Sequence, residues 1–427
     1  MRASELIEKL KNGSFDNSIV SLYEGKDKTE RRDRILSVAT EFLSFYGDLD
    51  VVIFSSPGRT EISGNHTDHN NGLVLASAVD IDIVAIAAKT NDKTVRIKSI
   101  GYREETIDIS SPSPEKVRKA SSEAIIAGIA DYFRKQGFIA DGFTAYTVSE
   151  VATGSGLSSS AAFEMLCAKI FSYFYNDNNI SPIELAKAGK YSENLFFGKP
   201  CGLMDQAVCS VGGCVFIDFK NNSEPTVEKL DFDIKSKGYS LCIINTGGSH
   251  SDLTEDYASV TSEMRSVSLL MGKPNLRCCE EADFLHRIPY IRTLVGDRAC
   301  MRAMHYFAEN RRVDAQKEAI KKGDFDRFFE LVTESGNSSF KYLQNAYTVK
   351  NVKEQGIPLA LAISERHSRA CRLHGGGFAG TIQAYVKNDV LDSFVGEIEA
   401  IFGNGSCKVL NLRKHGTVII KENEILD

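Results

Sequence analysis

The sequence contains no apolar run of the roughly 18 residues that a membrane-spanning helix requires. Residues 1–8 are charged and lack the apolar core of a secretory signal peptide. The formal net charge is only −6, so there is no positive excess to favour nucleic acid or an anionic membrane. We therefore expect a soluble, cytoplasmic protein of about two or three domains, without a nucleic-acid or membrane partner.

Cysteine pairs at metal-binding spacing are also absent. The ten cysteines are scattered, with one adjacent pair at Cys278 and Cys279, and no two form Cys-x-x-Cys. This pattern indicates no zinc site, and without a signal peptide free thiols are favoured over disulfides. The sequence also lacks the Gly-x-x-x-x-Gly-Lys-Ser/Thr phosphate loop and the protein-kinase signatures.

A stretch rich in glycine and serine, residues 154–160, runs directly into a helical pattern. It reads Gly-Ser-Gly-Leu-Ser-Ser-Ser, and apolar residues then recur at helical spacing at Ala162, Met165, Leu166, Ile170 and Phe174. Glycine leaves backbone N–H groups open to a ligand, and a helix start adds unpaired donors and a partial positive charge. The stretch therefore predicts a cradle for an anion, with phosphate expected. From this loop alone, a serine-capped helix after a turn is the alternative.

A second polar stretch, residues 55–72, follows a short strand expected at residues 51–54. The stretch reads as a loop that holds a fixed cation and a cluster of hydrogen-bonding side chains: Arg59, Asn65, His66 and Asp68. Such a set suits a ligand that carries many hydroxyl groups. Two alternatives remain open at this point: a metal site at His66, Asp68 and His69, and a merely solvated loop.

The rest of the pattern predicts mixed helix and strand. Residues 1–46 are expected to form two helices, and residues 262–349 are expected to be mostly helical with no identifiable chemistry. Further helices are expected at residues 114–135 and 182–196, and strands at residues 81–97, 143–148, 212–216, 241–245 and 381–386. Residues 375–380 fit Gly-x-Gly-x-x-Gly, but a strand is expected where a dinucleotide site needs a helix, so we expect no such site.

Four blocks of this sequence carry a family resemblance. Residues 57–69 resemble the galactokinase signature Pro-Gly-Arg-Val-Asn-Leu-Ile-Gly-Glu-His-Thr-Asp-Tyr, and residues 154–160 resemble the phosphate loop of the wider GHMP kinases. Residues 193–206, which end in Pro-Cys-Gly-Leu-Met-Asp-Gln, and residues 371–380 resemble two further blocks of that family. The blocks follow the family's order and span residues 57–386, so the resemblance covers nearly the whole chain.

The resemblance implies a two-domain α+β architecture with the active site between the domains. An S5-like domain would cover residues 1–230, and a ferredoxin-like domain would cover residues 231–427. The implied activity is the ATP- and Mg²⁺-dependent phosphorylation of galactose, or of a close relative, at the anomeric hydroxyl, by a monomer. The alternatives are a galacturonate or N-acetylgalactosamine 1-kinase, and a non-catalytic sensor that binds sugar and ATP.

The resemblance also implies roles for individual residues. Asp205 would accept the proton of the acceptor hydroxyl, and Arg59 would stabilise the transferring charge. Ser160 and Glu193 would bind Mg²⁺. The expected contacts to the nucleotide phosphates are Gly154, Ser155, Gly156, Leu157, Ser158, Ser159 and Ser160, and the expected contacts to the sugar are Asn65, His66, Thr67, Asp68, Gly202 and Tyr257.

Several positions depart from the family pattern. Asn65 stands where the signature has the Glu that contacts the C6 hydroxyl of the sugar, which leaves the identity of the sugar open. Glu61 stands where the signature has Asn. The other departures are His69 for Tyr, Ala152 for Pro, and Gly376 and Ala379 in the last block.

Overall fold

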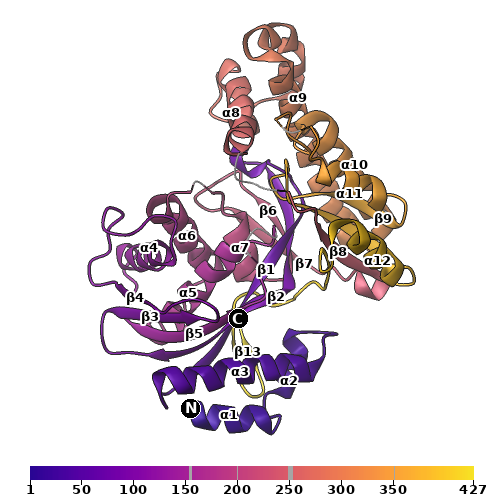
Figure 1. The fold of residues 1–427 in the computed structure, drawn as a ribbon. Helices are drawn as coiled ribbons and strands as arrows, with labels where there is room; N and C mark the ends of the chain where they lie inside the picture. The colour runs from indigo at the N-terminus through magenta and orange to yellow at the C-terminus, as the bar shows by residue number, and fades with distance from the viewer. Residues whose placement is uncertain (153–155, 200, 249–252, 351) are drawn as a thin grey trace.

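The protein is represented by a computed structural model that describes residues 1–427 except 153–155, 200, 249–252 and 351 (Figure 1). Within the described residues, nine strands form one sheet, in which β6 and β7 branch from β2, and four strands form a second sheet with the order β11-β8-β10-β9. The strands of the large sheet are β1 Val52–Ser63, β2 Leu73–Lys89, β3 Thr94–Ser99, β4 Glu105–Asp108, β5 Phe143–Ser149, β6 Cys214–Asp218, β7 Thr226–Leu230, β12 Val418–Ile420 and β13 Ile425–Leu426. Those of the small sheet are β8 Tyr239–Asn245, β9 Ser368–His374, β10 Thr381–Lys387 and β11 Cys407–Leu410.

Helices cover both faces of the large sheet. One face packs against α1 Ala3–Lys11, α2 Asp16–Leu22 and α3 Lys28–Tyr46, and the other against α4 Ser122–Lys135, α5 Ser159–Tyr175, α6 Pro182–Ser192 and α7 Met204–Val211 (Figure 1). Even-numbered residues 84–88 of β2 belong to the core beneath α1–α3, and odd-numbered residues 83–87 belong to the other core. Because successive side chains point to opposite faces, a strand buried on both sides reads as one continuous apolar run.

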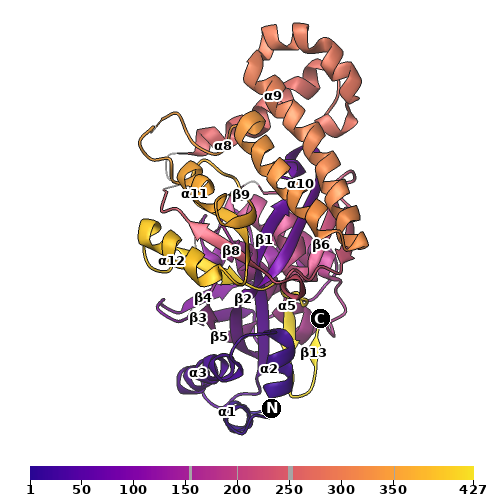
Figure 2. The same cartoon turned by 90° about the vertical axis from the view of Figure 1, so that its right-hand side faces the viewer.

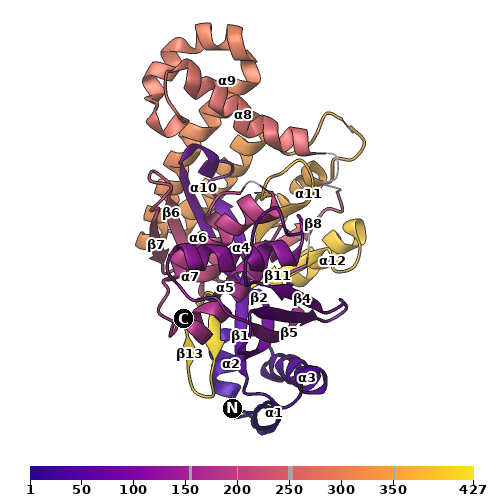
Figure 3. The same ribbon diagram turned by 90° about the vertical axis from the view of Figure 1, so that its left-hand side faces the viewer.

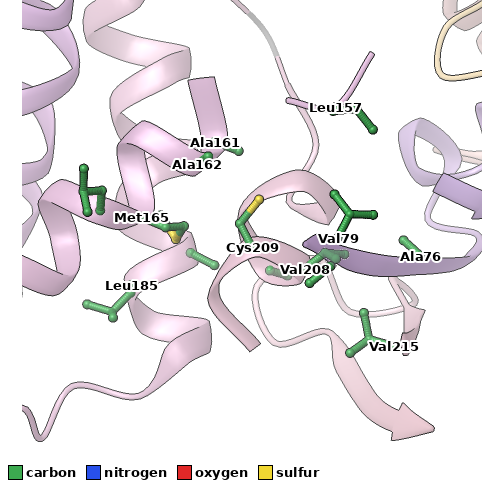
Figure 4. Close-up of a cluster of buried hydrophobic side chains, with 14 of the residues drawn as sticks. Ala76, Val79, Leu157, Ala161, Ala162, Met165, Leu185, Val208, Cys209 and Val215 are labelled. Atoms are coloured by element: carbon green, nitrogen blue, oxygen red, sulfur yellow. The ribbon is translucent and has the colours of Figure 1, made fainter. Parts of the chain in front are cut away.

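The core around α5 and α7 is made of small and medium apolar side chains. Figure 4 shows Met165 of α5, Leu185 of α6 and Val208 of α7 in this cluster, together with Val79 of β2 and Val215 of β6. This packing holds the start of α5 and the start of α7 on the same side of the sheet. Both helix starts carry residues that the sequence predicts to be functional.

The C-terminal half contains the longer helices. The helix α8 Thr254–Leu270 and the first part of α9 Glu281–Lys322 project away from the sheets (Figure 2). The helix α9 is kinked at Gly296, where φ is 85°, and its later part packs on the large sheet through Val313, Ala319 and Ile320. The helices that pack on or near the small sheet are α10 Phe325–Ser338, α11 Gly356–Ser364 and α12 Leu391–Phe402. Short turns are η1 Asp68–Asn70, η2 Glu193–Phe197, η3 Lys235–Lys237, η4 Leu276–Cys278 and η5 Ser339–Leu343, of which η2 and η5 are π-helical. Every helix of the described chain is too short or too polar to span a lipid bilayer.

The chain ends by returning to the large sheet. Strand β12 pairs antiparallel with β1, placing Ile420 opposite Ile53, and β13 pairs with β12 (Figure 3). The large sheet therefore contains the first and the last strands of the chain. The expected division between residues 230 and 231 coincides with the end of β7 but stays a prediction.

Two local predictions were wrong. Residues 1–46 form three helices, because α2 lies between the two expected ones. The strand expected at residues 51–54 continues through the first half of the supposed loop and ends at Ser63, with register shifts between Pro57 and Arg59 and between Glu61 and Ser63. Polar residues can occupy this buried strand because each finds a partner on a distant element, which a local pattern does not show.

Other local predictions were close to the structure. The strand expected at residues 143–148 is confirmed. The strand β10 follows the glycine-rich block at residues 375–380, where the sequence predicts a strand and a dinucleotide site would need a helix. The helix expected to start at residue 114 starts at Ser122, and the helix expected at residues 182–196 changes to π-helical geometry at Glu193. Residues 262–349 are mainly helical, as expected.

A buried charge cluster joins the N-terminal helices to the end of the chain. Asp82 of β2 is fully buried and accepts hydrogen bonds from Arg34 Nη1 at 2.6 Å, Tyr23 Oη at 2.6 Å and Arg413 Nη1 at 3.0 Å. Burial alone would raise the pKa of Asp82, but Arg34 and Arg413 outweigh it and lower this pKa to about 2. The carboxylate therefore stays ionised inside the protein.

We expect Asp82→Asn to destabilise the fold by about 3–5 kcal/mol, because it leaves buried guanidinium groups without a counter-charge. An unfolded aspartate has a pKa of about 4, so the carboxylate's contribution to stability is present above about pH 4 and lost as the pH falls toward 2. Urea unfolding between pH 3 and 7 measures both effects. Asp16→Asn is the control, because Asp16 is partly exposed and pairs with Lys28 and Arg32 at the surface. Equal losses in the two variants would contradict the prediction.

Candidate active site

A cleft of about 380 Å³ lies where the two sheets approach each other. Its lining comes from β1, the start of α5, the turn η2, the start of α7 and the loop between β9 and β10: Arg59, Gly156, Ser158, Ser159, Ser160, Glu193, Phe197, Lys199, Asp205, His374, Gly375, Gly376, Gly377, Ala379, Gly380 and Thr381. The structure thus brings all four sequence blocks together, although they are widely separated along the chain.

Asp205 and Arg59 form a bidentate ion pair in this cleft. Arg59 Nε donates to Asp205 Oδ1 at 2.6 Å, and Arg59 Nη2 donates to Oδ2 at 2.7 Å. The hydroxyl of Ser158 also donates to Oδ2, at 2.6 Å. The surrounding protein alone would raise the pKa of Asp205, but Arg59 and Ser158 outweigh this and hold it below its usual range. Asp205 is therefore a carboxylate at neutral pH and can accept a proton.

The glycine-serine segment lies against β1 at the start of α5. The backbone N–H of Arg59 donates to the carbonyl of Leu157 at 3.1 Å, and Gly156 has a φ of 73°. A Cβ at Gly156 would lie 2.6 Å from Thr381 Oγ1, so glycine is required here by both its φ angle and its close packing. Ser158 is also left-handed, with a φ of 58°, and α5 begins at Ser159. The predicted contacts Gly154 and Ser155 lie outside the described residues.

A pair of acidic side chains adjoins Ser160. Glu193 is buried, and Gln206 Nε2 donates to it at 3.0 Å and to Glu164 at 2.8 Å. Glu164 lies one helical turn after Ser160, and burial together with the charge of Glu193 raises its pKa. Its Oε1 is buried without a hydrogen-bond partner. Hydroxyl and carboxylate oxygens are the ligands that Mg²⁺ prefers, so Ser160 and Glu193 fit this ion.

Three of the six predicted sugar-binding residues, Asn65, His66 and Tyr257, contact the loop at residues 375–377. His66 Nε2 lies 2.9 Å from the carbonyl of Gly376, and Tyr257 Oη donates to the carbonyl of Gly377 at 2.8 Å. Burial lowers the pKa of His66 to about 4, so this imidazole is neutral and donates. Gly202 lies directly against Asp68, where a Cβ would collide with the carboxylate. Thr67 instead holds the backbone, since its hydroxyl lies 2.6 Å from the carbonyl oxygen of Leu73 and 2.8 Å from that of Gly64 and shares its one hydrogen between them.

His66, Asp68 and His69 do not form the alternative metal site considered from the sequence. The Nε2 atom of His66 is directed to the carbonyl of Gly376 at 2.9 Å, and the backbone N–H of His69 donates to Asp68 Oδ1 at 2.9 Å. Among the described residues, no cluster of three His, Cys, Asp or Glu side chains could hold a metal ion. The solvated-loop alternative is also wrong for this segment, because Asn65 and Thr67 are buried and His66 and Asp68 are at least partly buried.

Asn65 is held by protein groups on every side. Its Nδ2 donates to Glu61 Oε1 at 2.9 Å and to the carbonyl of Gly375 at 2.6 Å, and its Oδ1 accepts from Asn345 Nδ2 at 2.7 Å. Arg372 Nη2 donates to the same oxygen of Glu61 at 3.1 Å. A direct contact between Asn65 and a ligand would therefore replace one of these hydrogen bonds. The contact to a sugar stays a prediction.

The sequence analysis missed polar residues of α9 that hold this segment. His305 Nε2 lies 3.0 Å from the carbonyl of Asn65, and Glu309 Oε1 accepts from Ser63 Oγ and from the backbone N–H of Gly64, both at 3.0 Å. Asn310 Oδ1 accepts from the backbone N–H of Leu73 at 2.6 Å. The sequence analysis identified no chemistry in this helical region, and the structure adds that these side chains, of which His305 and Glu309 are buried, position the segment at residues 63–73. The only signal in the sequence was the i, i+4 spacing of His305 and Glu309, which places both on one helix face.

Comparison with known proteins agrees with this arrangement. The family of GHMP kinase N-terminal domains matches residues 124–213, and the galactokinase galactose-binding signature matches residues 40–89. A galactokinase of Limosilactobacillus reuteri is 30% identical over 377 residues, which cover 85% of this chain and 93% of that protein. A galactokinase of Clostridium acetobutylicum is 29% identical over 357 residues, or 82% of this chain and 88% of that protein.

Solved structures share the fold. The galactokinase of Lactococcus lactis, crystallised with galactose, superposes with a TM-score of 0.77 at 24% identity, over 90% of this chain and 99% of that one. The mevalonate kinase of Methanococcus jannaschii gives a TM-score of 0.59 at 15% identity, over 85% and 98%. The fold and the cleft thus define a kinase of the GHMP class, with the expected two-domain α+β architecture.

Within that class, the chain belongs to the galactokinase family. The resemblance seen in the sequence is thereby confirmed, and the protein is a sugar kinase that transfers a phosphoryl group to an alcohol. The roles of individual residues are not tested by these similarities and stay predictions.

We expect Asp205→Asn to lower kcat by about 10²–10⁴-fold, because the acceptor hydroxyl loses its proton acceptor.

Arg59→Met should also slow turnover. Removing this cation raises the pKa of Asp205, so the acidic limb of the kcat profile should move to higher pH. Ser158→Ala removes one hydrogen bond and no charge, so it should move that limb less. Because the pKa of Asp205 lies below its usual range in the wild type, kinetics from pH 5 to 9 should show an acidic limb in Arg59→Met that the wild type lacks. A profile of Arg59→Met without an acidic limb would contradict the prediction.

A second prediction concerns the exchange of Asn and Glu relative to the family signature. Asn65→Glu alone places a carboxylate next to Glu61, and Glu61→Asn alone leaves buried Arg372 without its counter-charge. Each single change should cost about 2 kcal/mol or more. The double variant restores one amide and one carboxylate in the signature's order and should recover about 1–3 kcal/mol of this loss. Unfolding midpoints and kcat/KM measure the cycle, and strictly additive losses would show that the two positions act independently.

Proposed function

We propose that the protein phosphorylates galactose at the anomeric hydroxyl, with ATP as phosphoryl donor, and releases galactose 1-phosphate and ADP. One observation carries this proposal. A side chain held as a carboxylate, which can accept a proton, lies in the same cleft as a glycine-serine loop that begins a helix. Asp205 supplies the acceptor, and residues 156–160 supply the start of α5. A sugar hydroxyl bound in this cleft would lie near a proton acceptor, and a nucleotide phosphate would lie near the N–H groups of the loop. Phosphoryl transfer requires both an oriented acceptor and a stabilised phosphate.

The residues of the cleft divide the work between proton transfer and charge stabilisation. Asp205 orients the sugar hydroxyl and accepts its proton as the new O–P bond forms. Backbone N–H groups of residues 156–160 hold the nucleotide phosphates. Ser160 and Glu193 would hold Mg²⁺, which supplies charge neutralisation for the phosphates when bound. Arg59 fixes Asp205 and adds positive charge beside the transferring group.

The substrate is assigned by the family and by the surrounding side chains. The similar curated proteins are galactokinases, which favours galactose over galacturonate and N-acetylgalactosamine. His66, Asp68, Gly202 and Tyr257 would contact the sugar's hydroxyl groups, and Asn65 and Thr67 would shape that side of the site. We propose that galactose and ATP are the molecules on which the enzyme acts. We also propose that it is a cytoplasmic monomer.

An assay of sugar-dependent ADP release tests the proposed function. We expect galactose to give the highest kcat/KM in a panel with galacturonate and N-acetylgalactosamine, and omission of Mg²⁺ to abolish release. Galactose binding should be measured in parallel by calorimetry. Sugar binding without ADP release above background would instead identify a sensor, and a higher kcat/KM for either other sugar would reassign the substrate.

A further inference from the structure

Lys199 is a basic residue of the cleft that has no role in the mechanism above. It follows the π-helical turn η2, which ends at Gly198 with a φ of 89°. The backbone N–H groups of Gly198 and Lys199 both donate to the carbonyl of Glu193 at 3.0 Å. This turn brings the chain back over its own start. As a result, Lys199 Nζ lies 3.1 Å from Glu193 Oε1.

The two side chains of this ion pair differ in how exposed they are and in how easily they can move. The side chain of Glu193 is only 4% exposed, and Gln206 fixes its other oxygen. The side chain of Lys199 is 62% exposed and lines the cleft with Ser160 and Asp205. An exposed lysine pair contributes little to stability and its ammonium can reorient at low cost. Glu193 is therefore the fixed partner, and Lys199 is the partner that can move.

Lys199 also has a larger share of its hydrogen-bonding capacity free for a ligand than the other basic residues of the lining. Arg59 uses Nε and Nη2 on Asp205, and its Nη1 on the carbonyl of Gly156. His374 contacts Thr60 and Thr381 through its two ring nitrogens, and burial lowers its pKa to about 3, so it is neutral. Among the described residues that line the cleft, Lys199 is the cation best able to turn toward a phosphate.

We propose that Lys199 is a further phosphate-binding residue of this enzyme, which releases Glu193 and contacts the nucleotide phosphates. This inference rests on the proposed function. An ammonium and a divalent cation beside the same carboxylate repel each other, so Lys199 and Mg²⁺ compete for Glu193. The phosphates carry the negative charge that the displaced ammonium then pairs with. Lys199 thus supports nucleotide binding and opposes binding of the metal.

The two parts of this role predict changes of opposite sign. Lys199→Met should weaken ATP binding in the presence of EDTA by about tenfold or more, because a charge-assisted hydrogen bond is lost. The same variant should lower the Mg²⁺ concentration that gives half-maximal enhancement of ADP binding, because the competing ammonium is gone. Isothermal titration calorimetry measures both quantities without turnover. Glu193→Gln should raise that Mg²⁺ concentration.

Matched variants separate this role from a general loss of structure. Lys199→Arg keeps the charge and should retain most of the metal-free affinity, whereas Lys199→Gln should behave like the methionine variant. Lys414→Met is the control, because Lys414 pairs with Glu24 at 2.8 Å in an equally exposed position outside the cleft. Galactose binding should be unchanged in all of them.

Several outcomes would overturn the inference. Equal metal-free ATP affinities in the wild type and Lys199→Gln would do so, as would a wild type that binds ATP only with Mg²⁺. Parallel weakening of ATP, Mg²⁺ and galactose binding would show that Lys199 only supports the structure of the turn. A wild type that binds no nucleotide under any condition would instead refute the proposed kinase function.

Discussion

The bidentate pair between Arg59 and Asp205 connects the parts of the cleft. It joins the middle of β1 to the first turn of α7, and the remaining Arg59 nitrogen contacts the carbonyl of Gly156. A single planar guanidinium therefore positions the Asp205 carboxylate and the glycine-serine segment relative to each other. Lysine has one point charge and could not hold both groups in a fixed geometry. The same cation also keeps the carboxylate ionised.

This pair depends on a buried strand that is unusually polar. Glu61 and Thr60 of β1 are buried, and their side chains contact Arg372 and His374 of β9. Buried polar groups are costly unless they are hydrogen-bonded, so β1 is stable in this position only when the small sheet is packed against it. The assembly of the two sheets and the formation of the cleft are consequently one event.

The exchange of Asn and Glu at positions 61 and 65 follows from the same constraint. Relative to the family signature, the carboxylate has moved to the side of Arg372, and the amide has moved to the side of Asn345 and Gly375. One amide and one carboxylate are still hydrogen-bonded to each other. Within a hydrogen-bonded polar network, two changes that compensate each other are tolerated better than either alone.

The sequence by itself determined the family and the fold class, and it supplied the candidate groups to which we assign the chemistry. Ordered motif blocks and the local periodicity of α5 and β5 are sufficient for this, because neighbouring residues decide helix starts, glycine turns and strand alternation. Only the tertiary structure decided that β1 runs through the polar stretch to Ser63. It alone showed that His305 and Glu309 hold residues 63–65, and that Asn65 is enclosed by protein groups. The physical reason is that each of these features depends on hydrogen bonds between residues hundreds of positions apart, and one sequence contains no local signal for such pairs.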